Sequence, residues 1–288
     1  MIPSANILEW AEHAPWPALR QIEQDLIICR ALCSIFSDPF LSERLAFRGG
    51  TAINKLLFSS PLRYSEDIDL VQVKAEPIGT TLDALRKELG WLGDCRIDRS
   101  KHSTHLIFKF VPEDSDAGAP LNLKVEMNTR EHDALFGHKR YPFAMANTWF
   151  NGEVEIVSFD ANELFGTKLR ALLQRRKNRD LFDLGEGLKR LDLNPDKVVE
   201  AFNHYLKLED KAISRSDAEE RVLAKLNHDL VEDVAPLLPV GIEFSADMAL
   251  GALQSIWTTF VVRLKGEPWR STPHAIDDVR RTFPSFLR

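Results

Sequence analysis

The stretch that decides the fold is RGGTAINKLLFSSPLRYSEDIDLVQV, residues 48–73. Its two adjacent glycines, Gly49 and Gly50, let the backbone turn sharply and come close to a ligand. Thr51 then opens a short predicted helix over residues 51–58, and the N–H groups at the N-terminus of a helix are a natural site for phosphate. The segment therefore predicts an anion site built from the glycine pair and the threonine.

The same stretch ends in two aspartates that share one face of a predicted strand. Apolar and β-branched residues after position 67 favour a strand. Side chains alternate faces along a strand, so Asp67 and Asp69 point the same way while Ile68 and Leu70 point into the core. Neighbouring carboxylates repel each other unless a cation lies between them, and Mg²⁺ prefers carboxylate oxygens. An Asp-x-Asp pair alone also fits a solvated strand end, but beside the glycine turn it predicts metal-assisted phosphoryl transfer.

The residues on either side of this stretch predict an α+β half followed by a helical half. In the first half we expect helices at 16–37 and 79–91 and strands at 45–48, 104–111 and 121–128. From about residue 160 the apolar spacing is helical, with helices expected at 163–176, 180–191, 195–209, 216–232 and 245–263. We therefore predict an α+β domain over residues 1–158 and a helical domain over 159–288.

The composition, charge and cysteine content restrict which kinds of protein this chain can be. Hydrophobic residues make up 44% of the 288, enough for a core that needs no disulfide or metal staple. The net charge of −6 excludes a protein that coats nucleic acid along its whole surface. Three cysteines without a regular framework suggest a reducing compartment. No signal-like N-terminus and no membrane-length apolar run is present, so we expect a cytoplasmic protein without a membrane partner.

A second motif, ELFGTKLRALLQRRKNRDLFDL, spans residues 163–184. Together with GGTAINKLLFSSPLRYSEDIDL (residues 49–70) it resembles the AbiEii-type toxins of the DNA polymerase β-like nucleotidyltransferase superfamily, and the two motifs occur in the family's order. The resemblance implies a polymerase β-like core with a mixed sheet, followed by a helical C-terminal domain. It also implies that Gly50 and Thr51 hold a nucleoside triphosphate and that Asp67 and Asp69 hold Mg²⁺ or Mn²⁺.

The resemblance assigns two further catalytic positions to the second motif. Lys168 would neutralise phosphate charge, and Asp183 would be a catalytic residue. On an unbroken helix the two would lie about 22 Å apart, from a rise of ~1.5 Å per residue. We therefore expect the helix to break near Lys177–Asn178, where asparagine tolerates the left-handed conformation that ends helices, so that the chain reverses and returns Asp183.

Other polar residues flank these motifs. Glu126 lies on the polar face of the strand expected at 121–128, where it fits either a third metal ligand, a base for the acceptor hydroxyl, or a solvent-facing glutamate. Lys55 and Arg63 could reach a phosphate or serve only as surface cations. Ser65, two residues before Asp67, would lie close to the metals and the terminal phosphates.

A basic run lies inside the second motif. Residues 168–179 contain six Lys or Arg and no acidic residue. The run fits either a solvated helix face or a surface that guides a phosphate backbone, in which case Arg175, Arg176 and Arg179 would contact the acceptor.

The resemblance implies a toxin that transfers a nucleotide to the 3′ end of tRNA and is neutralised by a cognate antitoxin. Two alternatives stay open at this level. The acceptor could be a small molecule or a protein, or the chain could bind a triphosphate without catalysis. Neither the nucleotide nor the acceptor follows from the residues.

Overall fold

The computed structural model describes residues 2–100, 103–113, 120–284 and 286–287. The chain divides into two compact units. The first comprises the residues up to Asp160 together with Leu237–Gly241, and the second comprises Ala161–Pro236 and the residues from Ile242 onward. The return of residues 237–241 to the first unit is anchored by the N–H of Tyr64, which donates to the carbonyl oxygen of Leu237 at 2.7 Å.

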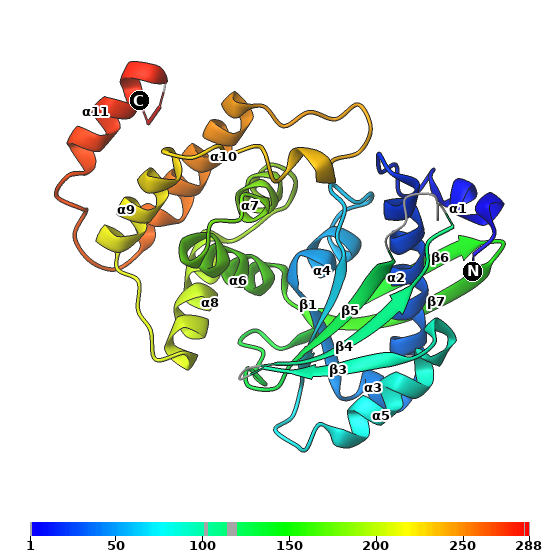
Figure 1. The fold of residues 1–288 in the computed structure, drawn as a ribbon. Coiled ribbons are helices and arrows are strands. Elements are labelled where there is room, and N and C mark those ends of the chain that lie inside the picture. The colour runs from blue at the N-terminus through cyan, green and yellow to red at the C-terminus, as the bar shows by residue number, and fades with distance from the viewer. Residues whose placement is uncertain (1, 101–102, 114–119, 285, 288) are drawn as a thin grey trace. The chain divides into compact units, whose positions relative to one another are not determined.

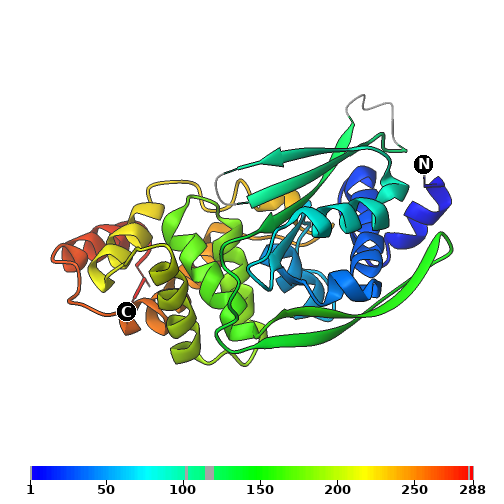
Figure 2. The same ribbon diagram turned by 90° about the horizontal axis from the view of Figure 1, so that it is seen from below.

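The first unit is built on a mixed sheet that contains seven strands among the described residues, in the order β3-β4-β5-β2-β1-β7-β6 (Figure 1). The strands are β1 (Leu45–Arg48), β2 (Asp67–Gln72), β3 (Cys95–Arg99), β4 (Ser103–Phe110), β5 (Leu121–Asn128), β6 (His138–Asn147) and β7 (Phe150–Phe159). The hairpins β3–β4 and β6–β7 form the two edges of the sheet (Figures 1 and 2).

Strand β2 lies near the middle of the sheet and carries both aspartates. It pairs with β1 in antiparallel and with β5 in parallel orientation. The register places Arg48 opposite Asp69 on one side and Glu126 opposite Asp69 on the other. Ile68 and Leu70 are buried, as expected from strand alternation.

Helices cover the sheet and supply much of its core. In the first unit these are α1 (Ser4–Trp10), α2 (Leu19–Ser37), α3 (Pro39–Ser42), α4 (Gly49–Leu56), α5 (Gly79–Glu88) and the 3₁₀ turn η1 (Gly90–Leu92). Helix α2 packs against β5, β6 and β7. Its apolar residues recur at helical spacing, and Leu26, Ile28 and Leu32 are fully buried. Burying each such side chain stabilises the fold by about 1.5–3 kcal/mol.

The second unit is helical in the part that the structure describes. Its elements are α6 (Ala161–Gln174), α7 (Arg179–Arg190), α8 (Pro195–Leu208), α9 (Arg215–Lys225), η3 (Ala235–Leu237, whose last residue belongs to the first unit), α10 (Ala246–Thr259), η4 (Val261–Arg263) and α11 (Thr272–Thr282). Side chains cap the starts of α8, α9 and α10: Asn194, Ser214 and Ser245 each accept a hydrogen bond from a backbone N–H of the first turn. These caps explain why the helices begin there.

The α+β prediction is confirmed, and most of the predicted elements lie within a few residues of the observed ones. Helix α4 begins at Gly49 rather than Thr51, and α9 ends at Lys225, earlier than expected. The elements that were not predicted are strands β3, β6 and β7 and helices α1, α3 and α11. In the described part of the chain, no helix combines the length and the apolar character that crossing a bilayer requires.

Candidate active site

The glycine turn lies directly against the carboxylate of Asp69. Gly49 has a φ of +83°, in the left-handed region that favours glycine. A β-carbon at this position would stand 2.1 Å from Oδ2 of Asp69. Only a residue without a side chain therefore allows the start of α4 and this carboxylate to lie so close together.

Thr51 ties the start of α4 to the start of β2. Its hydroxyl donates to the carbonyl oxygen of Asp67 at 2.7 Å and lies 2.6 Å from the Oγ of Ser65. Thr51 is buried and Ser65 is half-buried. The threonine hydroxyl is therefore committed to holding the two segments together, and a phosphate at this turn would meet the backbone N–H groups of the helix start instead.

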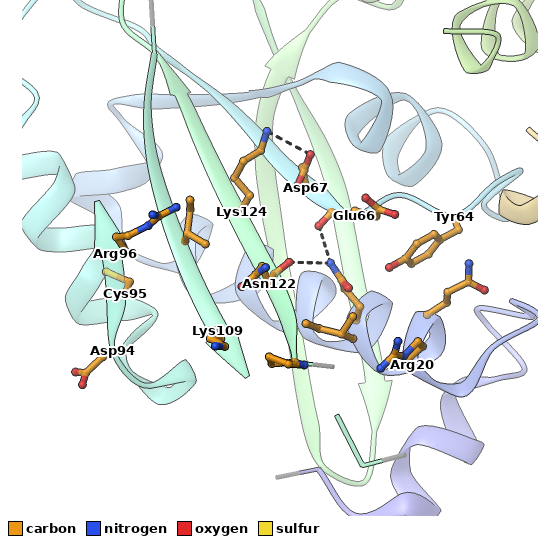
Figure 3. Close-up of a pocket in the computed structure, with 15 residues that line it drawn as sticks. Arg20, Tyr64, Glu66, Asp67, Asp94, Cys95, Arg96, Lys109, Asn122 and Lys124 are labelled. Atoms are coloured by element: carbon orange, nitrogen blue, oxygen red, sulfur yellow. Dashed lines mark hydrogen bonds and ion pairs between the residues drawn. The ribbon is translucent and has the colours of Figure 1, made fainter. Parts of the chain in front are cut away.

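Three carboxylates and a lysine share one face of β2 and β5. Asp67 is paired in register with Lys124, and Asp69 with Glu126, on adjacent parallel strands. The Nζ of Lys124 lies 3.4 Å from Oδ2 of Asp67 (Figure 3). It also donates to Oε2 of Glu126 at 3.1 Å. The ammonium therefore lies between two of the carboxylates, where it supplies positive charge. His105 on β4 completes the cluster, with its Nε2 3.4 Å from Oε2 of Glu126.

The pKa values of Asp69 and Glu126, on the same face, are shifted in opposite directions. Burial, and then the charges of Glu126 and Asp67, raise the pKa of Asp69, while Lys124 and Arg48 oppose the rise. Burial acts in the same direction on the pKa of Glu126, but the hydrogen bond and the charge of Lys124 outweigh it and the pKa is lowered. The pKa of Lys124 is raised in turn by its carboxylate neighbours, against the effect of burial. The site is thus short of positive charge at Asp69.

The donor chemistry of this face suits a hard divalent cation. Mg²⁺ and Mn²⁺ prefer carboxylate oxygens, and Asp67, Asp69 and Glu126 supply them on one face. As the side chains lie, however, no three His, Cys, Asp or Glu residues of the described chain are gathered closely enough to hold an ion. The position of Lys124 between Asp67 and Glu126 gives a physical reason, because its ammonium holds those two carboxylates to itself.

Two predicted phosphate ligands have other partners. The Nζ of Lys55 contacts both carboxylate oxygens of Asp25 at 2.6 and 2.7 Å. Asp25 is buried, and the side chain of Lys55 is only 9% exposed. Arg63 is 2% exposed, and its Nη1 donates to the carbonyl oxygen of Tyr64. These cations are therefore committed to the packing of α2, α4 and the segment before β2.

Lys168 and Asp183 meet in the second unit, as the predicted chain reversal required. Helix α6 ends at Gln174 and α7 begins at Arg179. The Nζ of Lys168 lies 2.8 Å from Oδ2 of Asp183 and 3.2 Å from Oδ1 of Asp180. All three side chains are buried.

The physical reason given for the break was wrong. Asn178 has a φ of −72° and a ψ of −17°, which is right-handed, and it stands at the start of α7 rather than closing α6. Its backbone N–H donates to Oδ2 of Asp233 at 3.1 Å and its side-chain amide donates to the carbonyl oxygen of Asp229 at 2.9 Å. Contacts distant in sequence therefore fix the break.

The predicted acceptor contacts differ in their surroundings. Arg175 is bidentate to Asp180, with nitrogen–oxygen distances of 2.7 and 2.9 Å. Arg176 is exposed and Arg179 is half-buried, and neither forms an ion pair with a described residue. Among the described residues, Arg175 is thus the one of the three that pairs with a carboxylate, and this pairing also helps to hold the cluster around Lys168 together.

A large cavity opens beside Asp67 on the polar face of β3, β4 and β5. Its volume is about 1140 Å³, and its lining includes Asp67, Lys124 and Asn122 (Figure 3). Gln24 of α2 donates to the carbonyl oxygens of Glu66 and Asn122, which fixes one wall. Cations that also line the cavity are Arg20, Arg96 and Lys109; the acidic side chains besides Asp67 are Glu66 and Asp94. Arg96 and Lys109 are exposed and form no ion pair with a described residue.

A glycine turn against a carboxylate cluster, on a mixed sheet, is the arrangement that the family resemblance implied. The family model described as "Nucleotidyl transferase AbiEii toxin, Type IV TA system" matches residues 30–265. The chain belongs to the AbiEii family. It is thus a nucleotidyltransferase toxin of a type IV toxin–antitoxin system, a class that uses a nucleoside triphosphate and implies an antitoxin partner.

Solved structures share the fold of this AbiEii-family chain. The MenT4 nucleotidyltransferase toxin of Mycobacterium tuberculosis H37Rv superposes with a TM-score of 0.65 at 17% identity, covering 100% of this chain and 98% of that one. A putative nucleotidyltransferase from H. pylori gives a TM-score of 0.51 at 18% identity, covering 87% of this chain and 100% of that one. No functionally curated protein matches the chain significantly.

Three features of the site were missed from the sequence. Lys124 and His105 were not singled out, although strand alternation places both on the polar face; only the register with Asp67 and Glu126 shows that they meet the carboxylates. Asp180 was not recognised as the second partner of Lys168. Its position three residues before Asp183, on one face of the same helix, is a signal that could have revealed it.

Proposed function

We propose that this AbiEii-family toxin is a metal-dependent enzyme that transfers a nucleotide from a nucleoside triphosphate to the 3′ end of tRNA in the cytoplasm, which stops translation until a cognate antitoxin neutralises it. The observation that carries the proposal is the contact between the glycine turn and Asp69, with Asp67 and Glu126 on the same face. An anion site and a cation site then adjoin each other within one unit.

The chain's own residues have separate tasks in this proposal. The backbone at Gly49, Gly50 and Thr51 binds the triphosphate, and Ser65 lies beside it through its hydrogen bond with Thr51. Asp67 and Asp69, with Glu126 as a third donor, hold Mg²⁺ or Mn²⁺. The bound cation would neutralise charge on the triphosphate and polarise its phosphorus–oxygen bonds.

The second motif contributes further residues to the proposal through the family resemblance. Lys168 neutralises phosphate charge, and Asp183 positions it through their ion pair. Arg175, Arg176 and Arg179 contact the acceptor backbone.

The order of the strands favours binding of the acceptor on the side of the carboxylates that is away from the glycine turn. The glycine turn follows β1, the carboxylates lie on β2 and β5, and the cavity extends over β5, β4 and β3. In displacement at phosphorus, the attacking and leaving oxygens lie in line on opposite sides. With pyrophosphate leaving toward the turn, the acceptor hydroxyl attacks the α-phosphorus from the cavity. The new oxygen–phosphorus bond forms as the bond to the β-phosphate breaks, and the hydroxyl proton passes to a carboxylate of this face.

Purified protein incubated with bulk tRNA and each of the four α-labelled triphosphates, with and without Mg²⁺, tests the proposal. We expect label on tRNA with at least one triphosphate, only when Mg²⁺ is present, and none with Asp69→Ala. Label on a small molecule or a protein pool instead of tRNA would refute the acceptor while keeping the chemistry. Triphosphate binding without pyrophosphate release, whatever the acceptor, would refute catalysis.

A further inference from the structure

A second cavity, within the helical unit, has a basic lining. It has a volume of about 380 Å³ and lies between the end of α6 and one face of α9. Among the described residues that line it there is no carboxylate. Its basic side chains are Arg175, Arg176, Arg221, Lys225 and His228. A concave surface with this composition has a positive potential that attracts anions.

The most informative of these side chains is Lys225. It is 8% exposed, and its Nζ donates to the carbonyl oxygen of Arg175 at 2.9 Å. No carboxylate in the described parts of the chain lies within ion-pair distance of it. Burial lowers the pKa of Lys225, and Arg176 and Arg175 lower it further against the opposing charges of Asp180 and Asp233. A buried cation without a paired anion is costly to a fold, which points to a ligand that supplies the missing charge.

A purely structural role accounts for only part of the cluster. Arg221 donates to the carbonyl oxygen of Leu173 at 3.1 Å, and Lys225 donates to that of Arg175. Both therefore cap the last carbonyls of α6, where positive charge also favours the helix dipole. Arg176 and His228, however, are exposed, and their side chains have no partner among the residues that the structure describes. Capping alone does not explain why they gather at the same cavity.

We propose that this cavity binds a phosphate group, held by Lys225 from within and by Arg176, Arg221 and His228 at its rim. Its volume is near the lower end for ligand sites, so it suits one phosphate with part of a sugar rather than a whole nucleotide. Two sources share this chemistry. One is a backbone phosphate of the RNA acceptor, which rests on the proposed function. The other is free inorganic phosphate or pyrophosphate, which does not.

The first experiment measures thermal unfolding of the full chain in EDTA with increasing inorganic phosphate or pyrophosphate. A ligand that binds only the folded state raises the unfolding midpoint with its concentration. We expect the wild type and the control Lys207→Ala, which changes an exposed cation on α8, to show the rise. Lys225→Met should start from an equal or higher midpoint without phosphate, because an apolar isostere removes an unpaired buried charge, and should respond less to phosphate.

The second experiment measures anisotropy of a labelled single-stranded RNA of about eight nucleotides over a range of salt concentrations. Arg221→Ala/His228→Ala keeps Lys225 buried and changes only exposed side chains, neither of which is among the proposed acceptor contacts. If the site takes a backbone phosphate, the slope of log affinity against log salt is shallower in the variant than in the wild type by about 0.7. The affinity that the variant loses relative to the wild type is then about fivefold larger at 0.1 M salt than at 1 M salt. If it takes free phosphate, RNA affinity stays unchanged while the phosphate-dependent rise in midpoint is lost.

Both of these results support a phosphate site and separate its two sources. The proposal is overturned if Lys225→Met keeps the full phosphate response, or if the double variant matches the wild type in both experiments. The variant Asp69→Asn distinguishes failure of this proposal from failure of the transferase proposal. It removes a proposed metal ligand in the first unit and leaves the basic cavity of the second unit unchanged. That variant should lose nucleotide transfer and keep the response attributed to the basic cavity.

Discussion

Replacing Gly49 with alanine tests the contact at the centre of the site. The new β-carbon would stand 2.1 Å from Oδ2 of Asp69, whereas an ordinary contact is at least 3.4 Å, so the carboxylate must move by more than 1 Å. A misplacement of this size in a catalytic group can cost about 100-fold in rate. The φ of +83° adds backbone strain of about 1–2 kcal/mol. Gly49→Ala should therefore fold with a modest loss of stability and lose most of its activity.

Gly137→Ala is the matched control for Gly49→Ala. Gly137 has a φ of +74°, but no atom of the described residues lies within 4 Å of where its β-carbon would stand. It carries comparable backbone strain without touching the carboxylate, so activity should stay near the wild-type level. Growth arrest under graded induction, nucleotide transfer to bulk tRNA, and thermal unfolding would be measured for both variants. Activity of Gly49→Ala within twofold of the wild type, or an equal loss in Gly137→Ala, would refute the reasoning.

Three further predictions follow from the charged clusters. Lys168→Ala should lower the free energy of unfolding by about 3–5 kcal/mol, because it leaves Asp180 and Asp183 buried without their shared cation. A denaturant titration measures this change, and an unchanged unfolding midpoint would contradict the prediction. Burial and neighbouring carboxylates raise the pKa of Asp69, so its ionisation destabilises the fold increasingly as pH rises from the usual range of an aspartate to that raised pKa. Asp69→Asn should therefore unfold at a higher temperature than the wild type at pH 7, by a margin that shrinks as the pH is lowered; a margin that grows would contradict the assignment. Lys124→Met should bind Mn²⁺ more tightly than the wild type without nucleotide, because the competing ammonium is gone; equal affinities by calorimetry would show that Lys124 does not compete.

The sequence could predict those parts of the site that depend on local periodicity. Alternation along residues 67–72 placed both aspartates on one face, and the separation of Lys168 from Asp183 required a chain reversal, which the structure shows between α6 and α7. Each of these inferences uses only the repeat of a strand or the rise of a helix.

The parts that escaped prediction depend on contacts between distant segments. Lys124 joins the carboxylates because β2 pairs with β5, 57 residues further along by the Asp67–Lys124 register. Lys55 resembled a phosphate ligand in its motif, yet Asp25 of α2 pairs with it inside the core. Asn178 was expected in a left-handed conformation, but its contacts with residues 229 and 233 hold it right-handed. No local pattern encodes which distant group will lie nearby.

The most direct test of the acidic pair and the glycine turn is Mn²⁺ binding followed by electron paramagnetic resonance, with and without a triphosphate that has a non-hydrolysable α–β linkage. The wild type should bind Mn²⁺ more tightly when the triphosphate is present, because both ligands would share one site. Asp69→Asn should lose at least tenfold in that affinity, whereas the unrelated exposed variant Lys207→Ala should not. Mn²⁺ and triphosphate binding that is independent of Asp69 would show that this carboxylate does not hold the catalytic cation.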